Sequence, residues 1–310
     1  MSNTVLEYLP SNISRIIQKQ KYWMRNEVIE IRMRVNQALQ LLTIDREVFI
    51  KNQNDYYIIS QEDVEKAFVI LTQNSLYAVE RQLSEGFITI EGGHRVGFTG
   101  QAVIKEGKIY TIKNINSLNY RITRQVSGIG RKVIKKIYNK YTDTIFNTLI
   151  IAPPLCGKTT LLRDLVYLIS EGDRQSGING KKIAVIDERS EIAGAYNGIA
   201  QNKIGSRTDL LDNCPKAEGI MILIRSMSPE LIAFDEIGRD EDVQAVREAV
   251  NAGVSLLTTV HGQNMDTIEE RPSIKKLLKT NAFQRFIILS RKNGIGTIEG
   301  VFDGSGREVV

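Results

Sequence analysis

The chain has 310 residues, 42% hydrophobic and 25% charged, which is enough for two domains and is the composition of a folded globular protein. No apolar run approaches the roughly 18 residues of a membrane-spanning helix, and the N-terminal segment lacks the pattern of an export signal. Two cysteines exclude a disulfide framework, and a formal net charge of +5 is compatible with several kinds of anionic partner. We therefore expect a cytoplasmic protein.

The first part of the chain mixes helical and strand patterns. Apolar side chains recur at helical spacing within 61–83, and β-branched and aromatic residues flank the turn that contains His94. We expect His94 to lie on the surface of that turn. The predicted elements are a strand within 27–41, a helix at 61–83, a hairpin at 86–104, and strands at 108–113 and 119–126. Together they predict a smaller α+β domain over residues 1–130.

From residue 131 the pattern changes to strands alternating with helices. Residues 131–141 form a predicted basic amphipathic helix that leads into this part, and the polar, Gly-rich loop 189–216 is long enough to suggest function. Strands are predicted at 144–152, 181–187, 230–236, 254–260 and 285–290, helices at 160–170, 217–227, 241–250 and 272–280, and a hairpin at 291–303. The alternation predicts an α/β domain over 131–310, with ligands at the carboxyl ends of parallel strands.

Residues 152–160, APPLCGKTT, match the phosphate-loop pattern G-x-x-x-x-G-K-S/T except that Ala152 replaces the first glycine. The stretch lies between a predicted strand and a predicted helix, so that an anion would meet free N–H groups at the positive end of the helix dipole. Alanine is tolerable at this position if its φ stays negative. We predict that Lys158 binds phosphate and that Thr159 binds Mg²⁺. The predicted nucleotide contacts are Pro154, Leu155, Cys156, Gly157, Lys158, Thr159 and Thr160.

The predicted strand at 230–236 ends in two carboxylates, Asp235 and Glu236. A carboxylate at this position can hold Mg²⁺, and a second one can polarise the attacking water. The alternative is an acidic start to the next helix, stabilised by the helix dipole. That alternative accounts for residues 240–242, but unpaired carboxylates are costly at the end of a buried strand. We therefore assign Asp235 to the metal and Glu236 to catalysis.

Two further predicted strands end in polar residues. The first is followed by Asp187, Glu188, Arg189 and Glu191, and the second ends in Thr258, Thr259 and His261. With the phosphate loop and Asp235, these residues would meet at one edge of one sheet, which predicts hydrolysis of a nucleotide bound with Mg²⁺. The two cysteines suggest neither a nucleophile nor a zinc site.

Several segments occur in the order of a known family: SLNYRITRQV, APPLCGKTTLLRDL, VIDERSEIAG, IRSMSPELIAFDEIGRDED and TTVHG. Together with EIRMRV and GFITIEGGHRVGFTG they resemble the stage III sporulation AA family, ATPases of endospore-forming bacteria related to type II and type IV secretion ATPases. The resemblance covers most of the chain. It implies a RecA-like P-loop ATPase core preceded by a smaller α+β domain, and a homo-oligomeric ring, expected to be a hexamer.

The resemblance also implies a cellular role. ATP hydrolysis would power or gate a channel complex in the membrane between mother cell and forespore. Because the sequence has no membrane segment, attachment to the inner face of the mother-cell membrane would depend on membrane channel proteins as partners.

The resemblance assigns roles to matching residues. Segment 187–191 looks like the acidic box of secretion ATPases, and His261 matches the histidine that senses the γ-phosphate. The general P-loop pattern makes Glu236 the catalytic base, whereas the secretion-ATPase pattern makes it Glu188 or Glu191, and the choice stays open.

An arginine is also expected to stabilise charge on the transferred phosphoryl group. Arg239 is our catalytic candidate. The other candidates are Arg121, Arg124, Arg189, Arg207 and Arg225.

Two alternative functions are weighed against this one. The first is a RecA-like ATPase stimulated by nucleic acid, or a single-strand binding protein, which would use Arg131, Lys132, Lys135, Lys136 and Lys140. A solvated helix face is favoured for that run, because aromatic residues that could stack on bases are sparse, and nucleic acid is not an expected partner. The second is a scaffold with a decayed loop, which the retained Lys158 and Thr159 argue against.

Overall fold

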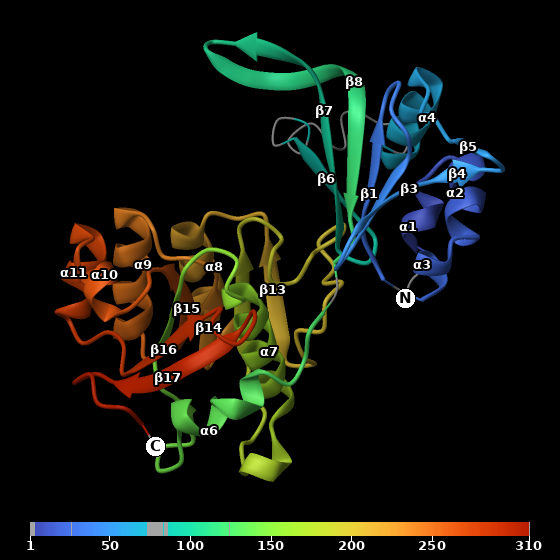
Figure 1. Cartoon of the computed structure of the whole chain (residues 1–310). Helices are drawn as coiled ribbons and strands as arrows, with labels where there is room; N and C mark the ends of the chain where they lie inside the picture. The colour runs from blue at the N-terminus through green and yellow to red at the C-terminus, as the bar shows by residue number, and fades with distance from the viewer. Residues whose placement is uncertain (1–3, 26, 73–82, 84–85, 124, 310) are drawn as a thin grey trace. The chain divides into compact units, whose positions relative to one another are not determined.

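The computed structural model describes residues 4–25, 27–72, 83, 86–123 and 125–309. The chain divides into two compact units, Met1–Arg124 and Gln125–Val310 (Figure 1). The sequence prediction had placed the boundary after residue 130. Within the described ranges, no helix is both long enough and apolar enough to cross a membrane.

The N-terminal unit is built on a six-stranded antiparallel sheet in the order β3-β2-β1-β8-β7-β6. Its elements are α1 (Thr4–Glu7), α2 (Ser11–Gln18), α3 (Lys21–Met24), β1 (Val28–Arg34), β2 (Gln40–Thr43), β3 (Glu47–Phe49), β4 (Lys51–Asn52), β5 (Asp55–Tyr56), α4 (Gln61–Leu71), β6 (Phe87–Ile90), β7 (His94–Lys105) and β8 (Lys108–Arg121). Alternate residues of β1, among them Ile31 and Met33, are buried in a core shared with α2 and α4. The far ends of β7 and β8 extend as a long curved ribbon (Figure 1).

The predicted helix at 61–83 begins where its capping residues require. The Ser60 hydroxyl accepts a hydrogen bond from the Asp63 amide, and the Asp63 carboxylate accepts one from the Ser60 amide. The described helix ends at Leu71, and positions 73–82 of the prediction lie outside the described residues.

The predicted hairpin at 86–104 is confirmed, with Ile90 of β6 paired to His94 of β7. The expectation of two strands at 108–113 and 119–126 was wrong, because the single strand β8 covers the first range and continues to Arg121, where it ends. The polar residues between them form a bulge instead of a turn, with Asn114 at φ +49°.

The surface position expected for His94 was also wrong. The ring is 5% exposed, its Nδ1 accepts a hydrogen bond from the Thr123 amide at 3.1 Å, and burial lowers its pKa. Gly92 makes room for the ring, because a Cβ at that position would lie 2.8 Å from the His94 Nε2. The turn therefore encloses the histidine.

The C-terminal unit contains a seven-stranded sheet in the order β13-β12-β14-β15-β11-β16-β17, parallel except for β17. Its elements are α6 (Ile134–Ile137), β9 (Tyr138–Asn139), β10 (Thr144–Ile145), β11 (Thr148–Ala152), α7 (Lys158–Glu171), β12 (Ile183–Asp187), β13 (Thr208–Asp212), α8 (Lys216–Met227), β14 (Leu231–Phe234), α9 (Asp240–Asn251), β15 (Ser255–His261), α10 (Met265–Glu269), α11 (Pro272–Leu278), β16 (Arg285–Ser290) and β17 (Thr297–Asp303). The predicted α/β alternation is confirmed.

Helices cover both faces of this sheet (Figure 1). Ile150 and Ala152 of β11 face a core that includes α7 and residues 133–137. Leu149 and Ile151 face the other core, which includes α8, α9, α10 and α11. A strand buried on both faces excludes charged side chains until it ends. The charged residues therefore gather at the strand ends.

Two predictions in this unit were wrong. Residues 131–141 do not form one helix: a short 3-10 turn (Gly130–Lys132) and α6 are followed by β9, which pairs with β10. The buried Ile134 and Ile137 hold the chain against α7, and this packing overrides the helical spacing. The loop 189–216 contains an unpredicted strand, β13, whose half-exposed edge position requires no apolar run.

Candidate nucleotide site

The phosphate loop joins β11 to α7. Ala152 is the last residue of β11, is fully buried and is not among the residues with positive φ, so the condition for replacing glycine is met. Gly157 has φ +86° and is the N-cap of α7, a position that leaves the first amide N–H groups of the helix without a side-chain cap. The start of α7 can therefore bind an anion.

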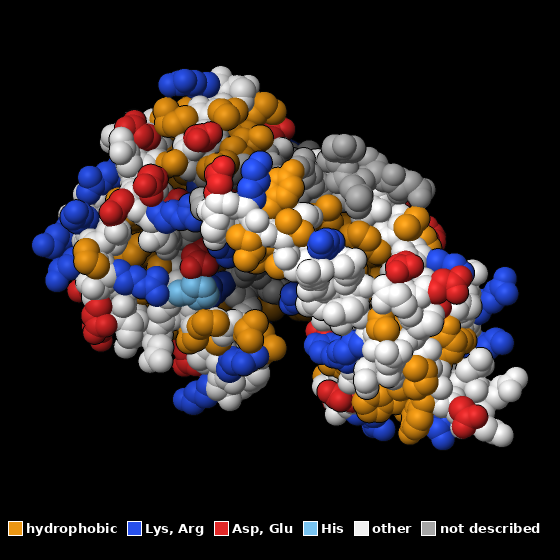
Figure 2. Space-filling model, turned by 90° about the horizontal axis from the view of Figure 1, so that it is seen from above, with side chains coloured by type: hydrophobic (Ala, Val, Ile, Leu, Met, Phe, Trp, Pro, Cys, Tyr) orange, Lys and Arg blue, Asp and Glu red, His pale blue; other side chains and the backbone are white. Residues whose placement is uncertain are grey.

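A cavity of about 490 Å³ lies against this loop. It is lined by Pro154, Leu155, Gly157, Lys158, Thr159, Thr160, Arg189, Glu191, Asp235, Glu236, His261, Arg291 and Ile295. Strands β12, β14, β15 and β11 are consecutive in the sheet, as the sequence predicted, so their carboxyl ends share one edge. Seen from above in Figure 2, a histidine and acidic side chains lie together on this unit, with basic side chains beside them. We call this space the phosphate cavity.

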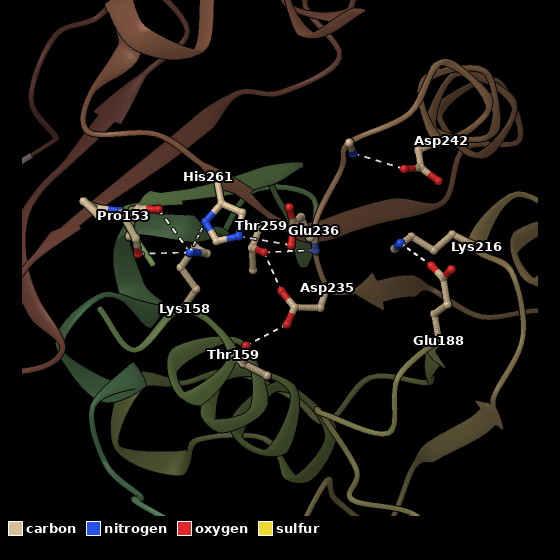
Figure 3. Close-up of polar contacts among 12 residues, drawn as sticks. Pro153, Lys158, Thr159, Glu188, Lys216, Asp235, Glu236, Asp242, Thr259 and His261 are labelled. Atoms are coloured by element: carbon tan, nitrogen blue, oxygen red, sulfur yellow. Dashed lines mark hydrogen bonds and ion pairs between the residues drawn. The ribbon is translucent and has the colours of Figure 1, made fainter. Parts of the chain in front are cut away.

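Lys158 is held at the base of the phosphate cavity (Figure 3). Its ammonium donates to the carbonyl oxygens of Ala152 and Pro153 at 3.1 Å each and contacts the His261 Nδ1 at 2.9 Å. An ammonium has only donors, so Nδ1 accepts and the neutral ring carries its proton on Nε2. That Nε2 lies 3.1 Å from a Glu236 carboxylate oxygen. A hydrogen-bonded path thus joins Lys158 to Glu236.

Burial lowers the pKa of Lys158, whereas Asp235 and Glu236 raise it. The lysine is therefore a desolvated cation beside carboxylates. A phosphate group is a ligand that would restore favourable contacts to it.

Thr159 and Asp235 form the second feature of the cavity. The Thr159 hydroxyl donates to one Asp235 oxygen at 2.6 Å, and the Thr259 hydroxyl donates to the other. Hydroxyl and carboxylate oxygens suit Mg²⁺, which in such sites takes one or two carboxylates together with substrate phosphates. No cluster of three or more acidic, histidine or cysteine metal ligands exists in the described part of the chain. Thr159 and Asp235 therefore fit a magnesium ion that depends on bound phosphate.

Glu236 has a strained backbone. Its φ is +51°, a conformation that costs a non-glycine residue about 1–3 kcal/mol. Its amide donates to the Thr259 hydroxyl at 3.0 Å, which anchors the turn directly after β14. The turn directs the carboxylate toward His261 and the phosphate cavity (Figure 3).

The segment after β12 is organised by a buried carboxylate. Asp187 accepts hydrogen bonds from the amides of Glu191, Ile192 and Ala193 at 2.7–2.9 Å. Burial raises the pKa of Asp187 to about 6, against the opposing effect of these amides. The Arg163 guanidinium of α7 donates to the Glu191 and Ile192 carbonyls at 2.5 Å each. Both contacts hold this segment so that Glu191 lines the phosphate cavity.

Glu188 and Arg239 lie in a smaller neighbouring cavity of about 110 Å³. Glu188 forms an ion pair with Lys216 of α8, away from Lys158 (Figure 3). The structure therefore brings together Glu191, Glu236 and His261 but places Glu188 and Arg239 beside them.

Of the remaining candidates, Arg189 lines both cavities, and the others lie elsewhere. Cys156 does not line the phosphate cavity, because its side chain is buried in the core under α7, and only its backbone lies in the loop. Arg207 donates to the Ser170 carbonyl. Arg225 is an exposed residue of the last turn of α8, and Arg121 belongs to the N-terminal unit. Arg124 lies outside the described residues.

Sequence analysis missed Arg291 and Ile295. Arg291 directly follows β16, the neighbour of β11, and in the described structure its guanidinium makes no hydrogen bond or ion pair. The rule that polar residues gather at strand ends would have identified it, but the segment was interpreted only as a hairpin turn. Ile295 lies over the loop, 3.4 Å from where a Cβ on Gly157 would be.

Comparison with known proteins identifies the family. The family model for sporulation stage III, protein AA, matches residues 2–309. The chain belongs to this family. It is 40% identical over 306 residues to stage III sporulation protein AA of Bacillus subtilis, covering 98% of this chain and 96% of that protein.

Solved structures show the same fold. The ATPase DotB of Legionella pneumophila aligns with a TM-score of 0.57 and 16% identity, over 90% of this chain and 75% of DotB. The pilus retraction motor PilT with bound ADP aligns with a TM-score of 0.58 and 13% identity, over 88% and 77% of the two chains. The fold is thus α/β and RecA-like, as predicted, and is preceded by an N-terminal unit.

Proposed function

We propose that this protein is a Mg²⁺-dependent ATP hydrolase that works as a homo-oligomeric ring during endospore formation. The observation that carries the proposal is the convergence of Lys158, the Thr159–Asp235 pair and the His261–Glu236 pair on one cavity. Family membership supports the sporulation role.

The residues have distinct tasks in this proposal. Lys158 exchanges its carbonyl partners for phosphate oxygens, and the first amides of α7 bind the same group. Thr159 and Asp235 hold Mg²⁺, which supplies charge neutralisation at the phosphates when it is bound. Glu236 accepts a proton from the attacking water, held in place by His261 and by its strained turn. Arg291 stabilises charge on the transferred group.

The ring and the membrane partner are also proposals. The side chains of His261 and Glu236 remain 32% and 39% exposed, and electrostatic stabilisation is stronger once water is excluded. A second copy of the chain is proposed to cover this opening. We also propose coupling to membrane channel proteins on the cytoplasmic face of the mother-cell membrane, as the family resemblance implies.

The nucleic-acid alternative loses its main support. The basic residues of 131–141 were expected on one long helix face, but α6 spans four residues and the chain then enters β9. No continuous basic helix face is left there to follow a phosphate backbone.

The test is phosphate release from Mg-ATP over a range of protein concentrations. Lys158→Ala is expected to lower turnover by about a hundredfold or more, because it removes a charge at the phosphates. Lys276→Ala, at an exposed lysine of α11, is the matched control and should keep wild-type turnover. Turnover per subunit that rises with concentration would support assembly. Full turnover in Lys158→Ala would contradict the proposal.

A further inference from the structure

A second cavity adjoins the phosphate cavity. It has a volume of about 340 Å³, and its walls include Ile129, Lys132, Asn293, Ile295, Gly296 and Ile298. Ile295 lines both cavities, so a ligand can pass over it from one to the other. All of these residues belong to the C-terminal unit.

The phosphate loop and the β16–β17 turn are in close contact at this point. A Cβ on Gly157 would lie 3.3 Å from the Gly296 Cα, and a Cβ on Gly296 would lie 3.5 Å from the Ile129 Cδ1. Both glycines have positive φ, at +86° and +83°. The second cavity therefore starts one residue layer away from the phosphate loop.

The walls of the second cavity have two kinds of chemistry. Ile129 and Ile298 are partly buried against the core under α7, which gives a supported apolar surface. Ile295 is 67% exposed and would lose contact with water if a flat apolar group lay against it. Asn293 and Lys132 supply polar groups, and within the described residues neither side chain has a hydrogen bond or ion pair.

We propose that this second cavity binds the aromatic base of the nucleotide whose phosphates lie at Lys158. Apolar side chains contact the faces of a planar ring, and Asn293, which both donates and accepts, can bond its polar edge. The inference rests on the proposed function, because it assigns the base end of the same ligand. It makes the turn after β16 part of nucleotide recognition, with Arg291 at the phosphate end and Asn293 at the base end.

The experiment compares two probes by calorimetric titration with Mg²⁺: ADP, and inorganic tripolyphosphate, which has no base. Ile129→Ser and Ile298→Ser each change a wall of this second cavity that the phosphate cavity does not share. Each is expected to weaken ADP binding about tenfold and to leave tripolyphosphate binding within about twofold, because apolar contact with the base is lost. Ile199→Ser is the matched control, since Ile199 is 68% exposed and lines neither cavity.

The outcomes separate the two proposals. Lys158→Ala should weaken both probes, which tests the phosphate cavity independently of the base. Suppose that both isoleucine variants bind ADP as the wild type does, while Lys158→Ala loses ADP binding. That result would overturn the assignment of the second cavity to the base and leave the proposed function standing. Wild-type protein that binds neither probe would overturn both. Thermal unfolding of both isoleucine variants checks that any loss reflects binding.

Discussion

Two acidic segments, the residues after β14 and the residues after β12, end neighbouring strands but differ in what their carboxylates contact. After β14, Asp235 is bonded by Thr159 and Thr259, and Glu236 contacts His261. At the end of β12, Asp187 is 2% exposed, and its carboxylate accepts hydrogen bonds from three backbone amides. The first segment presents its charge to a ligand, and the second uses its charge to shape a loop. Similar sequence signals thus serve chemistry in one segment and positioning in the other.

Of the substitutions that test this difference between the two segments, Asp235→Asn should lower turnover the most. It removes the charge that we assign to Mg²⁺, so turnover should fall about a hundredfold or more. The measurements are phosphate release and ADP binding over a range of Mg²⁺ concentrations. In Asp235→Asn, ADP binding should no longer depend on the Mg²⁺ concentration. Asp266→Asn, at an exposed aspartate of α10, is the control. Unchanged Mg²⁺ dependence in Asp235→Asn would break the assignment.

Asp187→Asn should have an intermediate effect. The neutral amide accepts the three backbone hydrogen bonds less strongly, so the segment that carries Glu191 loosens, and kcat should fall about tenfold with little change in KM. Steady-state kinetics would show this separation. A change confined to KM would mean that the segment contributes to substrate binding rather than to positioning.

The ionisation of Asp187 gives a second test of its role in positioning the segment that carries Glu191. Its pKa is raised from 3.8 to about 6, so the folded protein binds this proton more tightly than the unfolded chain does. Its contribution to stability is therefore fully present below pH 3.8 and is lost as the pH rises through 6. Activity should depend on pH in the opposite sense, because the ionised carboxylate holds the segment.

The ratio of wild-type to Asp187→Asn turnover should thus rise as the pH increases through about 6. Turnover measured for both proteins at a series of pH values gives this ratio directly. A ratio that does not change with pH would show that ionisation of Asp187 has no part in positioning.

Glu188→Gln should have the smallest effect. It breaks a half-buried ion pair with Lys216, which should lower the free energy of unfolding by about 1 kcal/mol or less. Turnover should stay within about twofold of wild type, because the phosphate cavity does not include Glu188. Denaturant unfolding and phosphate release check the two parts. A hundredfold loss of turnover would make Glu188 catalytic and reverse the comparison.

The sequence predicted the central strands of the C-terminal sheet better than it predicted the edge strand β13 and the 131–141 segment. Strands β11, β12, β14 and β15 were recognised because short apolar runs end in polar residues. The edge strand β13 has Leu210 and Leu211 between aspartates and shows no such run. The 131–141 segment was predicted as a helix from spacing alone, whereas packing against α7 and pairing of β9 with β10 decide its structure.

The candidate site could be predicted as a set of residues but not as a set of partners. That Glu188 pairs with Lys216, and Asp187 with the amides that follow it, depends on how the chain folds back after β12. No local spacing encodes those contacts. The position of Arg291 was predictable from the end of β16, whereas the contact of Ile295 with the phosphate loop depends on the path of the β16–β17 turn.

The most direct test of the central claim compares Glu236→Gln with Glu191→Gln at saturating Mg-ATP. Both side chains line the phosphate cavity, but only Glu236 belongs to the segment assigned to chemistry. We predict that Glu236→Gln lowers turnover by about a hundredfold or more while ADP affinity stays near wild type, and that Glu191→Gln lowers it by about tenfold or less. The reverse order would contradict the account and place the catalytic base on the segment after β12.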